Sequence, residues 1–155
     1  MKKVIAVMTI ALFLSFTGYT QAVQPLWAWQ NNFNAGITDI VYHNDFLYTC
    51  GNFSTAPFVF GNVNLANLGS NDALVMKWDT SGNLIWARRI AGSGSDVATS
   101  ICINASGEVV VAGYSNSGTL NIEGNIFASN GSNDIFAARF DANGSYISAN
   151  LLGTA

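Results

Sequence analysis

Charged residues are scarce in this sequence: Asp, Glu, Lys and Arg together make up 10% of its 155 residues, against about 25% in an average soluble domain. The formal net charge is −3, so no basic surplus points to nucleic acid, and a hydrophobic content of 50% excludes an intrinsically disordered chain. Long apolar runs are also lacking beyond residue 16. This excludes a protein with several transmembrane helices, because each span needs about 20 consecutive apolar residues.

Histidine and cysteine are equally rare, which leaves little material for a metal site. His43 is the sole histidine, and its neighbours Asn44 and Asp45 favour an exposed turn residue over a catalytic base. Cys50 and Cys102 both stand in apolar, strand-like runs, where cysteine packs as a small buried hydrophobe. That interpretation is favoured, while a disulfide between them stays open because the distance between their Cα atoms decides it.

The N-terminal segment has the three-part layout of a secretory signal peptide. Lys2 and Lys3 form a basic start, residues 4–16 are apolar, and small side chains precede a predicted cleavage site after Ala22. A membrane anchor is the alternative, but an apolar run of 13 residues is too short to cross a hydrocarbon core. We therefore expect residues 1–22 to be a cleaved signal peptide and the rest of the chain to be secreted, periplasmic or at the cell surface, without a membrane span.

An internal repeat is the most informative feature of the sequence. Residues 70–83 align with residues 132–145 at an offset of 62, and residues 47–51 align with residues 109–113 at the same offset. The length differences between the copies fall in stretches rich in Asn, Ser and Gly, as expected for loops. The predicted organisation is a first repeat over residues 23–83, a second over residues 84–145, and the start of a third over residues 146–155.

Each repeat alternates apolar and polar residues with the two-residue period of β-strands. Strands are predicted over residues 84–90, 99–104, 108–114 and 134–140, with a weaker pair over residues 120–122 and 125–128 that forms a short hairpin or an extended loop. In the first of these strands, Leu84 and Trp86 are expected on one face and Ile85 on the other. Glycine and asparagine interrupt every run of helical length, so the sequence predicts an all-β fold.

The two copies share a tight turn with a defined backbone requirement. Residues 79–83 and 141–145 begin with Asp, a side-chain acceptor, and have Gly in fourth position, where a left-handed residue is needed. They therefore predict hairpin turns. Asp79, Ser81 and Asn83 could also offer alternate oxygens to calcium, but one carboxylate without a bidentate Glu falls short of such a site.

About four antiparallel strands in every sixty residues is the content of one β-propeller blade. Residues 109–112 and 135–138 are apolar on both faces, as expected for a blade packed between two neighbours. The predicted fold class is therefore an incomplete propeller with two four-stranded blades and the start of a third. Propellers close with about four or more blades, so a pair alone leaves apolar faces and strand edges open to further copies or further blades.

The order of several segments also resembles a known family. The segments are Gly-Ser-Gly-Ser-Asp at 92–96, Thr-Ser-Ile at 99–101, Asn-Ala-Ser-Gly at 104–107, Val-Val-Val-Ala-Gly-Tyr at 109–114 and the stretch 132–144. In content and spacing they resemble the bacterial beta-propeller repeat family called SBBP. The resemblance implies an exported bacterial protein with bladed β architecture and no catalytic residues to carry over. The first copy departs from it, because residues 31–34 replace the Gly-Ser-Gly-Ser-Asp loop.

Two pairs of equivalent residues are candidates for binding. Lys77 and Arg139 correspond, so a closed ring could carry positive charge, although a strand-edge or surface base paired with a nearby carboxylate is favoured. Trp27 and Trp86 correspond at an offset of 59. Exposed, they could stack on a sugar; packing between blades is favoured.

A glycine-rich loop holds a third group of candidates. Ser93, Ser95 and Asp96 lie in it, but neither a nucleophile elbow nor the helix and lysine of a phosphate site accompanies them, which favours a connector. Glycosylation sequons begin at four asparagines and carry little weight in an asparagine-rich chain: Asn52, Asn104, Asn130 and Asn143.

The sequence therefore predicts an exported, non-enzymatic propeller-repeat module that binds or displays through loops at one rim. Its partner would be a protein or a glycan, and no catalytic, cofactor-binding or metal-ligating residue is assigned. The alternative is part of a secreted propeller enzyme such as a quinoprotein-like dehydrogenase, because the spacing of Asp79, Gly82 and Trp86 is similar to repeats of that group. A fragment without stability of its own is a third possibility.

Overall fold

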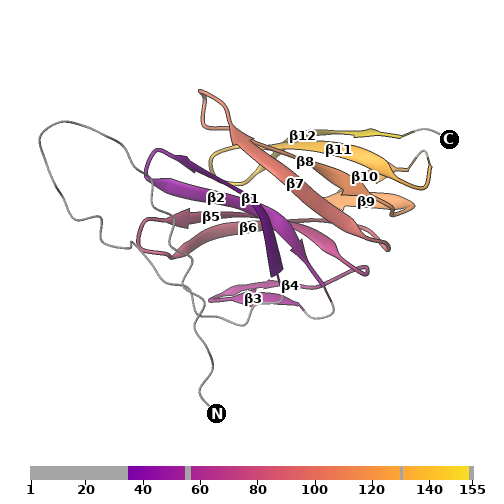
Figure 1. Cartoon of the computed structure of the whole chain (residues 1–155), viewed down its shortest axis with the longest axis horizontal. Helices are drawn as coiled ribbons and strands as arrows, with labels where there is room; N and C mark the ends of the chain where they lie inside the picture. Colours follow the sequence, from indigo (N-terminus) through magenta and orange to yellow (C-terminus); the bar gives the residue numbers. More distant parts are fainter. Residues whose placement is uncertain (1–34, 55–56, 130, 154–155) are drawn as a thin grey trace, which may run out of the picture.

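The computed structural model describes residues 35–54, 57–129 and 131–153 (Figure 1). The expected signal peptide, residues 1–22, and Trp27 lie outside these residues. Within them the chain is all-β, with antiparallel pairing in each sheet and no helix, and therefore no helix that could cross a membrane. The strands are β1 (Ala35–His43), β2 (Phe46–Phe53), β3 (Phe58–Phe60), β4 (Val63–Leu65), β5 (Asp72–Asp79), β6 (Leu84–Ala91), β7 (Asp96–Ile103), β8 (Val109–Ser115), β9 (Thr119–Ile122), β10 (Asn125–Ala128), β11 (Asp134–Phe140) and β12 (Tyr146–Leu152).

The two repeats form the same four-stranded arrangement. Strands β1, β2, β5 and β6 make a first sheet, and β7, β8, β11 and β12 make a second sheet, each in the order of the chain. A short hairpin follows the second strand of each sheet. The hairpin β3–β4 stands as a separate pair, whereas β9–β10 continues the first sheet, because Ile90 and Ala91 of β6 pair with Ile122 and Asn121 of β9. Residues 120–122 and 125–128 therefore form a hairpin that joins the two repeats.

The sheets and the sequence repeats divide the chain at different points. Strand β6 begins just after residue 83, where the sequence divides the repeats, yet it pairs with β5 in the first sheet. In the same way, β12 occupies the predicted start of a third repeat and is the fourth strand of the second sheet. The boundary between two copies of a tandem repeat can be drawn at any position of the repeated unit. Only the strand pairing shows which strands share a sheet.

Matching irregularities occur in the first strand of each sheet. The pairing shifts at Thr38 in β1 and at Thr99 in β7. Each threonine Oγ1 lies close to a carbonyl oxygen of the neighbouring strand, Thr38 at 3.2 Å from that of Cys50 and Thr99 at 3.3 Å from that of Ala112. The two copies therefore share the position of this β-bulge as well as the order of their strands, which indicates that the bulge is a regular feature of the repeat.

A second bulge changes which residues share a face of β6. Lys77 pairs with Trp86, but the next pair joins Trp78 to Leu84, so Ile85 is passed over. Leu84 therefore packs with Trp78, on the opposite side of the sheet from Trp86. The prediction that Leu84 and Trp86 share a face is wrong, because the extra residue of a bulge breaks the two-residue alternation.

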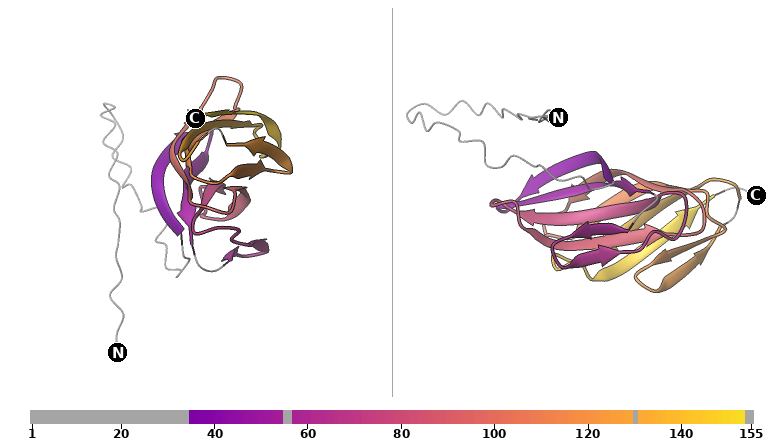
Figure 2. Two further views of the ribbon diagram at one scale, coloured as in Figure 1. Left: turned by 90° about the vertical axis from the view of Figure 1, so that its right-hand side faces the viewer. Right: turned by 90° about the horizontal axis from the view of Figure 1, so that it is seen from below.

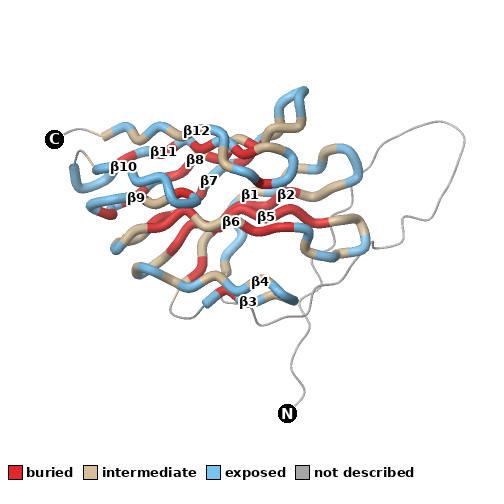
Figure 3. The backbone as a smooth tube through the Cα atoms, turned by 180° about the vertical axis from the view of Figure 1, so that it is seen from behind, coloured by how far each residue is buried: buried red, intermediate tan, exposed pale blue. Residues whose placement is uncertain are grey.

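The main core lies between the two sheets, whose facing surfaces we call the inner faces. The inner face of the first sheet contributes Tyr48, Cys50, Ala73, Val75, Trp86 and Ile90, and that of the second contributes Ala98, Ile101, Val109, Val111, Phe136, Ala138 and Phe140. A smaller apolar cluster lies on the far side of the first sheet, against β3 and β4. Buried residues accordingly follow β5, β6, β8 and β11 (Figure 3).

Polar contacts join the first strands of the two sheets. One Asp39 oxygen accepts hydrogen bonds from the backbone N–H of Ile101 (2.9 Å) and the hydroxyl of Ser100 (3.2 Å). The Thr38 hydroxyl donates to the Ala98 carbonyl at 2.6 Å. The N–H of Ile101 favours the ionised carboxylate, which holds the pKa of Asp39 below its usual 3.8.

The second sheet has an outer face that is open to solvent. Strand β11 alternates strictly, with Phe136 buried and Ile135 exposed, and Ile135 and Leu152 are 62% and 68% exposed. The expectation that residues 135–138 are covered on both faces is wrong, because no described segment packs on this side. Figures 1 and 2 show β11 and β12 at one end of the molecule and the hairpin β3–β4 at the other.

Both predicted turns form as expected. Gly82 and Gly144 have φ angles of 83° and 80°, the left-handed conformation that glycine adopts most easily. Asp79 Oδ1 accepts hydrogen bonds from the backbone N–H groups of Ser81 (2.9 Å) and Asn83 (2.8 Å). The Asp79 carboxylate, which a calcium ion would need as a ligand, thus accepts hydrogen bonds within its own turn.

Candidate functional site

Three loops meet at one end of the sheets and form a surface that we name the loop rim: residues 66–71, 92–95 and 116–118. Backbone hydrogen bonds join them, from Ser70 N to the Gly94 carbonyl (2.8 Å) and from Asn116 N to the Ser95 carbonyl (3.0 Å). Asn71 and Ser95 also form a parallel bridge. Because residues 92–95 connect the two sheets, the loop rim combines loops of both repeats.

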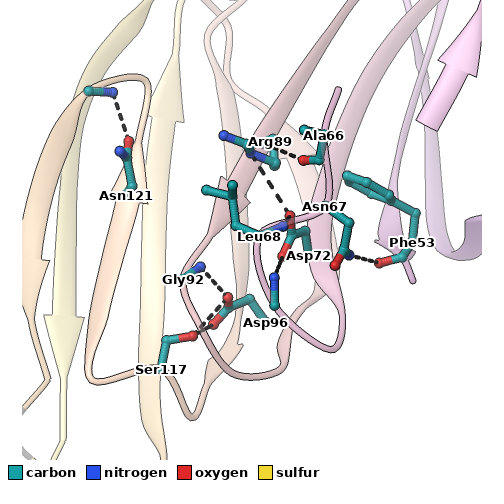
Figure 4. A network of polar contacts seen from close by, with 12 residues as sticks. Phe53, Ala66, Asn67, Leu68, Asp72, Arg89, Gly92, Asp96, Ser117 and Asn121 are labelled. Atoms are coloured by element: carbon teal, nitrogen blue, oxygen red, sulfur yellow. Dashed lines mark hydrogen bonds and ion pairs between the residues drawn. The ribbon is translucent and has the colours of Figure 1, made fainter. Parts of the chain in front are cut away.

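Asp96 anchors the loop rim from inside. Its carboxylate accepts hydrogen bonds from the hydroxyls of Ser115 and Ser117 and from the backbone N–H of Gly92 at 2.6 Å (Figure 4). The residue is fully buried, and burial raises the pKa of its carboxyl group, while these hydrogen bonds oppose the rise. Such a carboxylate is satisfied by the loops that it holds, so its role is structural, as the connector interpretation predicts.

Asp72 has the same role in the preceding loop. Its two oxygens accept hydrogen bonds from the backbone N–H groups of Leu68 (2.7 Å) and Gly69 (3.2 Å). Arg89 Nε lies 4.0 Å from the same carboxylate, and the guanidinium also donates to the Ala66 carbonyl (Figure 4). Burial raises the pKa of Asp72, the hydrogen bond from Leu68 and the charge of Arg89 oppose the rise, and the nearby Asp96 adds to it.

The outward surface of the loop rim carries neutral polar side chains. Ser70, Ser93 and Asn116 are exposed, and Leu68, half exposed, adds one apolar side chain. Loops fixed on a rigid sheet commonly carry binding functions. Hydroxyl and amide groups suit a ligand that offers neutral hydrogen-bonding groups, such as a sugar or a peptide backbone.

At the opposite end of the sheets, the turn 141–145 packs on the first sheet. The Ala142 carbonyl accepts hydrogen bonds from Lys77 Nζ (3.0 Å) and Trp86 Nε1 (3.2 Å), and the Gly144 carbonyl accepts one from Arg88 Nε (2.7 Å). An open pocket of about 540 Å³ lies between this turn, β4 and β6. Because its cationic side chains already bind the turn, they serve first to hold the repeats together.

Two of the predicted binding candidates behave as the favoured interpretation expected. Trp86 is 6% exposed, lies in the core between the sheets, and donates its Nε1–H to the Ala142 carbonyl of the second repeat at 3.2 Å, which confirms packing between the repeats. Arg139 lies at the surface with its Nη2 atom 2.7 Å from Glu108, which confirms a base paired with a carboxylate.

Lys77 differs from its equivalent Arg139. The prediction of a surface base paired with a carboxylate is wrong here, because Lys77 is buried. Its Nζ atom lies 4.0 Å from the centroid of the Phe46 ring and donates to the Ala142 carbonyl. A cation held by an aromatic face and a carbonyl needs no carboxylate.

The histidine and the cysteines lie apart from the loop rim. His43 ends β1, is partly exposed, and has its Nε2 atom 2.9 Å from Asn44 Nδ2. Both cysteines are free; Cys50 is buried as expected, whereas Cys102 is exposed, so the expectation of a buried residue is wrong for it. Burial raises the pKa of the Cys50 thiol. In the described part of the chain, no group of three or more His, Cys, Asp and Glu side chains is placed to hold a metal ion.

Sequence reasoning did not single out Asp72, Ser115 and Ser117 as residues whose hydrogen bonds hold the loop rim. A signal for Asp72 was present, because the offset of 62 places it on Asp134, and both precede an apolar strand. A buried carboxylate needs several donors, and these come from loops that are distant in sequence. Their identity follows only from the fold.

Comparison with known proteins adds one likeness. No protein-family model matches the chain. A stretch of 56 residues is 32% identical to part of an uncharacterised WD repeat-containing protein of Acanthamoeba polyphaga mimivirus. It covers 36% of this chain and 4% of that protein, so the chain spans a small part of its relative's length. Together with the duplicated antiparallel sheets, this likeness supports a repeat module of propeller-like character.

Proposed function

We propose that the chain is an exported, non-enzymatic propeller-repeat module that binds a protein or a glycan through the loop rim. The observation that carries the proposal is the junction of the two sheets, where buried Asp72 and Asp96 fix loops of both repeats into one surface. The sheets are the scaffold, and the exposed side chains of the loop rim are the contact surface. Each four-stranded sheet then corresponds to one blade of an incomplete propeller.

The use of the charged side chains supports a binding role over a catalytic one. Asp96 is held by three donors, Lys77 by an aromatic ring and a carbonyl, and Arg88 by the Gly144 carbonyl. A general acid or base needs an ionisable group within reach of a substrate. Asp96 and Lys77 are buried and Arg88 is partly exposed, and the hydrogen bonds of all three groups stabilise the loops and the repeat junction.

The loop-rim proposal is tested by binding to glycan and peptide arrays. Purified protein is compared with the variants Ser93→Arg and Leu68→Arg, which place a large cation on the loop rim, and with Ser106→Arg in the exposed turn at the other end of β7. We expect the two rim variants to lose captured probes at least about tenfold while the control retains them. Equal binding by all variants, or no binding to either array, would contradict the proposal.

Export and the absence of catalysis are tested separately. N-terminal sequencing of the protein recovered outside the cytoplasm is expected to begin at Val23, after the predicted cleavage site. The enzyme alternative predicts that the protein binds pyrroloquinoline quinone and reduces a dye in the presence of alcohols. Recovery of that activity would overturn the non-enzymatic assignment. A chain found only in the cytoplasm, with residues 1–22 retained, would overturn export alone.

A further inference from the structure

The junction inside the chain shows how one four-stranded repeat holds the next. Apolar inner faces meet, as described above. Strand β9 of the second repeat pairs with the free edge of β6. The turn 141–145 offers its carbonyls to Lys77, Trp86 and Arg88 of the first sheet. The junction between two repeats is thus made of three kinds of contact: packed apolar faces, a paired strand edge and hydrogen bonds to a turn.

The outer face of the second sheet holds the positions that form the inner face of the first. With the offset of 62, Val110, Ala112, Ile135, Ala137 and Leu152 correspond to Tyr48, Cys50, Ala73, Val75 and Ile90. The second set is buried between the sheets, with no exposed surface on Ala73 and Ile90. In the first set, Ile135, Ala137 and Leu152 are exposed and Val110 and Ala112 are partly exposed, and this exposed aliphatic surface marks an interaction surface.

The strand edges correspond in the same way. Ile90 and Ala91 of β6 pair with β9, and their equivalents Leu152 and Gly153 lie on the edge of β12 that no described strand occupies. Strand β3, the equivalent of β9, forms a two-stranded sheet with β4 in the described part of the chain. One end of the molecule thus presents an acceptor edge and the other presents the strand that fits it, an arrangement that favours head-to-tail association.

We propose that the outer face of the second sheet binds the β3–β4 end of a second copy of this chain, in the geometry of the internal junction. Leu152 of one copy then pairs with Phe60 of the next, as Ile90 pairs with Ile122. The turn 79–83 of the second copy packs beside Arg139, as the turn 141–145 packs beside Lys77. This inference rests on the proposed function, because it requires the chain to be a propeller-type repeat.

The contact between copies is weaker than the internal junction. Ser148 and Asn150 occupy the positions of Trp86 and Arg88, so two of the three side chains that hold the turn are replaced by shorter ones. Arg139, the third, is already paired with Glu108. Association is therefore reversible, and it responds to substitutions in both directions.

Sedimentation velocity over a range of protein concentrations tests the loss of association. Ile135→Asp places a charge on the outer face, and Ile126→Asp is the control, because both isoleucines are 62% exposed and Ile126 lies on β10, away from this face. We expect Ile135→Asp to raise the dissociation constant at least about tenfold and Ile126→Asp to leave it unchanged. A protein that stays monomeric at its highest soluble concentration, or equal effects of the two variants, overturns the proposal.

Restoring the internal contacts tests the gain of association. The double variant Ser148→Trp and Asn150→Arg rebuilds the side chains of the first sheet, and we expect it to lower the dissociation constant at least about tenfold. The thiol of Cys102, on the same outer face, should become slower to react with a thiol reagent as the protein associates. No tightening and no protection would overturn the geometry. Ser93→Arg leaves association unchanged, so a failure here is separate from a failure of rim binding.

Discussion

Ile90 and Leu152 hold equivalent places in the fourth strands of the two sheets, yet Ile90 has no exposed surface and Leu152 is 68% exposed. Each strand pairs with the preceding strand of its own sheet, β6 with β5 and β12 with β11, but Ile90 also pairs with Ile122 of β9 in the second repeat. The second repeat covers the inner face of the first sheet, whereas no described segment covers the outer face of the second sheet. Burial of a residue in a repeat protein is thus set by its neighbouring repeat.

The largest difference in stability is expected when the side chains of Ile90 and Leu152 are each truncated to alanine. Ile90→Ala should lower the free energy of unfolding by about 2–5 kcal/mol, because it leaves a cavity between the sheets. Leu152→Ala should change it by less than about 0.5 kcal/mol in dilute protein, where the outer face meets only water. Urea titration of both variants measures the difference. Equal losses would show that the outer face is covered in solution.

A glycine pair separates backbone strain from contact between the repeats. Gly107 and Gly144 have φ angles of 79° and 80°, but a Cβ atom on Gly144 would lie 2.8 Å from the Trp86 ring, whereas one on Gly107 has only Ala142 at 3.9 Å. Gly107→Ala should cost about 1–2 kcal/mol from the left-handed backbone alone. Gly144→Ala should cost about 1–3 kcal/mol more, since Trp86 must move. Thermal unfolding checks the order, and the reverse order would contradict the packing of the turn on the first sheet.

Acidification should change the contributions of Asp39 and Asp96 to stability in opposite directions. The pKa of Asp39 is lowered, mainly by the N–H of Ile101, so its contribution to stability is present above pH 3.8 and is lost as the pH falls through the folded-state value. The pKa of Asp96 is raised by burial, so its contribution is present below pH 3.8 and is lost as the pH rises through its folded-state value.

Unfolding titrations between about pH 3 and pH 7 test this pair. We expect the difference in free energy of unfolding between the wild type and Asp39→Asn to become smaller as the pH falls. The stability advantage of the wild type over Asp96→Asn is expected to become larger. The same direction for both variants would be incompatible with the different surroundings of the two groups.

The smallest effect on stability is expected at the cysteines, where the readout is chemical access. Cys102 should react with a thiol reagent in dilute native protein, while Cys50, which is buried between the sheets and has a raised pKa, should react only after unfolding. Cys102→Ser should change the free energy of unfolding by less than about 0.5 kcal/mol and abolish native labelling. Two reactive thiols in the native protein would mean that the junction opens readily.

Most of the strands could be predicted from the sequence because their alternation is local. The predicted run 134–140 coincides with β11, and the left-handed glycines of the two turns are where the pattern places them. The hairpin β3–β4 was not predicted, since runs of three residues are too short to show a period. The face of Leu84 was mistaken for a related reason: a bulge is invisible to a pattern that assumes strict alternation.

The candidate site was less predictable than the fold. Asp96 was recognised as belonging to a connector, but its partners Ser115 and Ser117 lie about twenty residues away, and only the pairing of β7 with β8 brings them within hydrogen-bond distance. Lys77 and Arg139 correspond in sequence, and one is buried while the other is exposed. Equivalence in sequence therefore predicts position in a repeat and not chemical surroundings.

By itself the sequence determined the repeated unit, its strands and its turns, because alternation and turn chemistry act over a few neighbouring residues. Only the tertiary structure decided which strands share a sheet, which of two equivalent faces is covered, and which donors satisfy the buried carboxylates. Those outcomes depend on segments tens of residues apart in the chain, and hydrogen bonding and burial are set by distance in space.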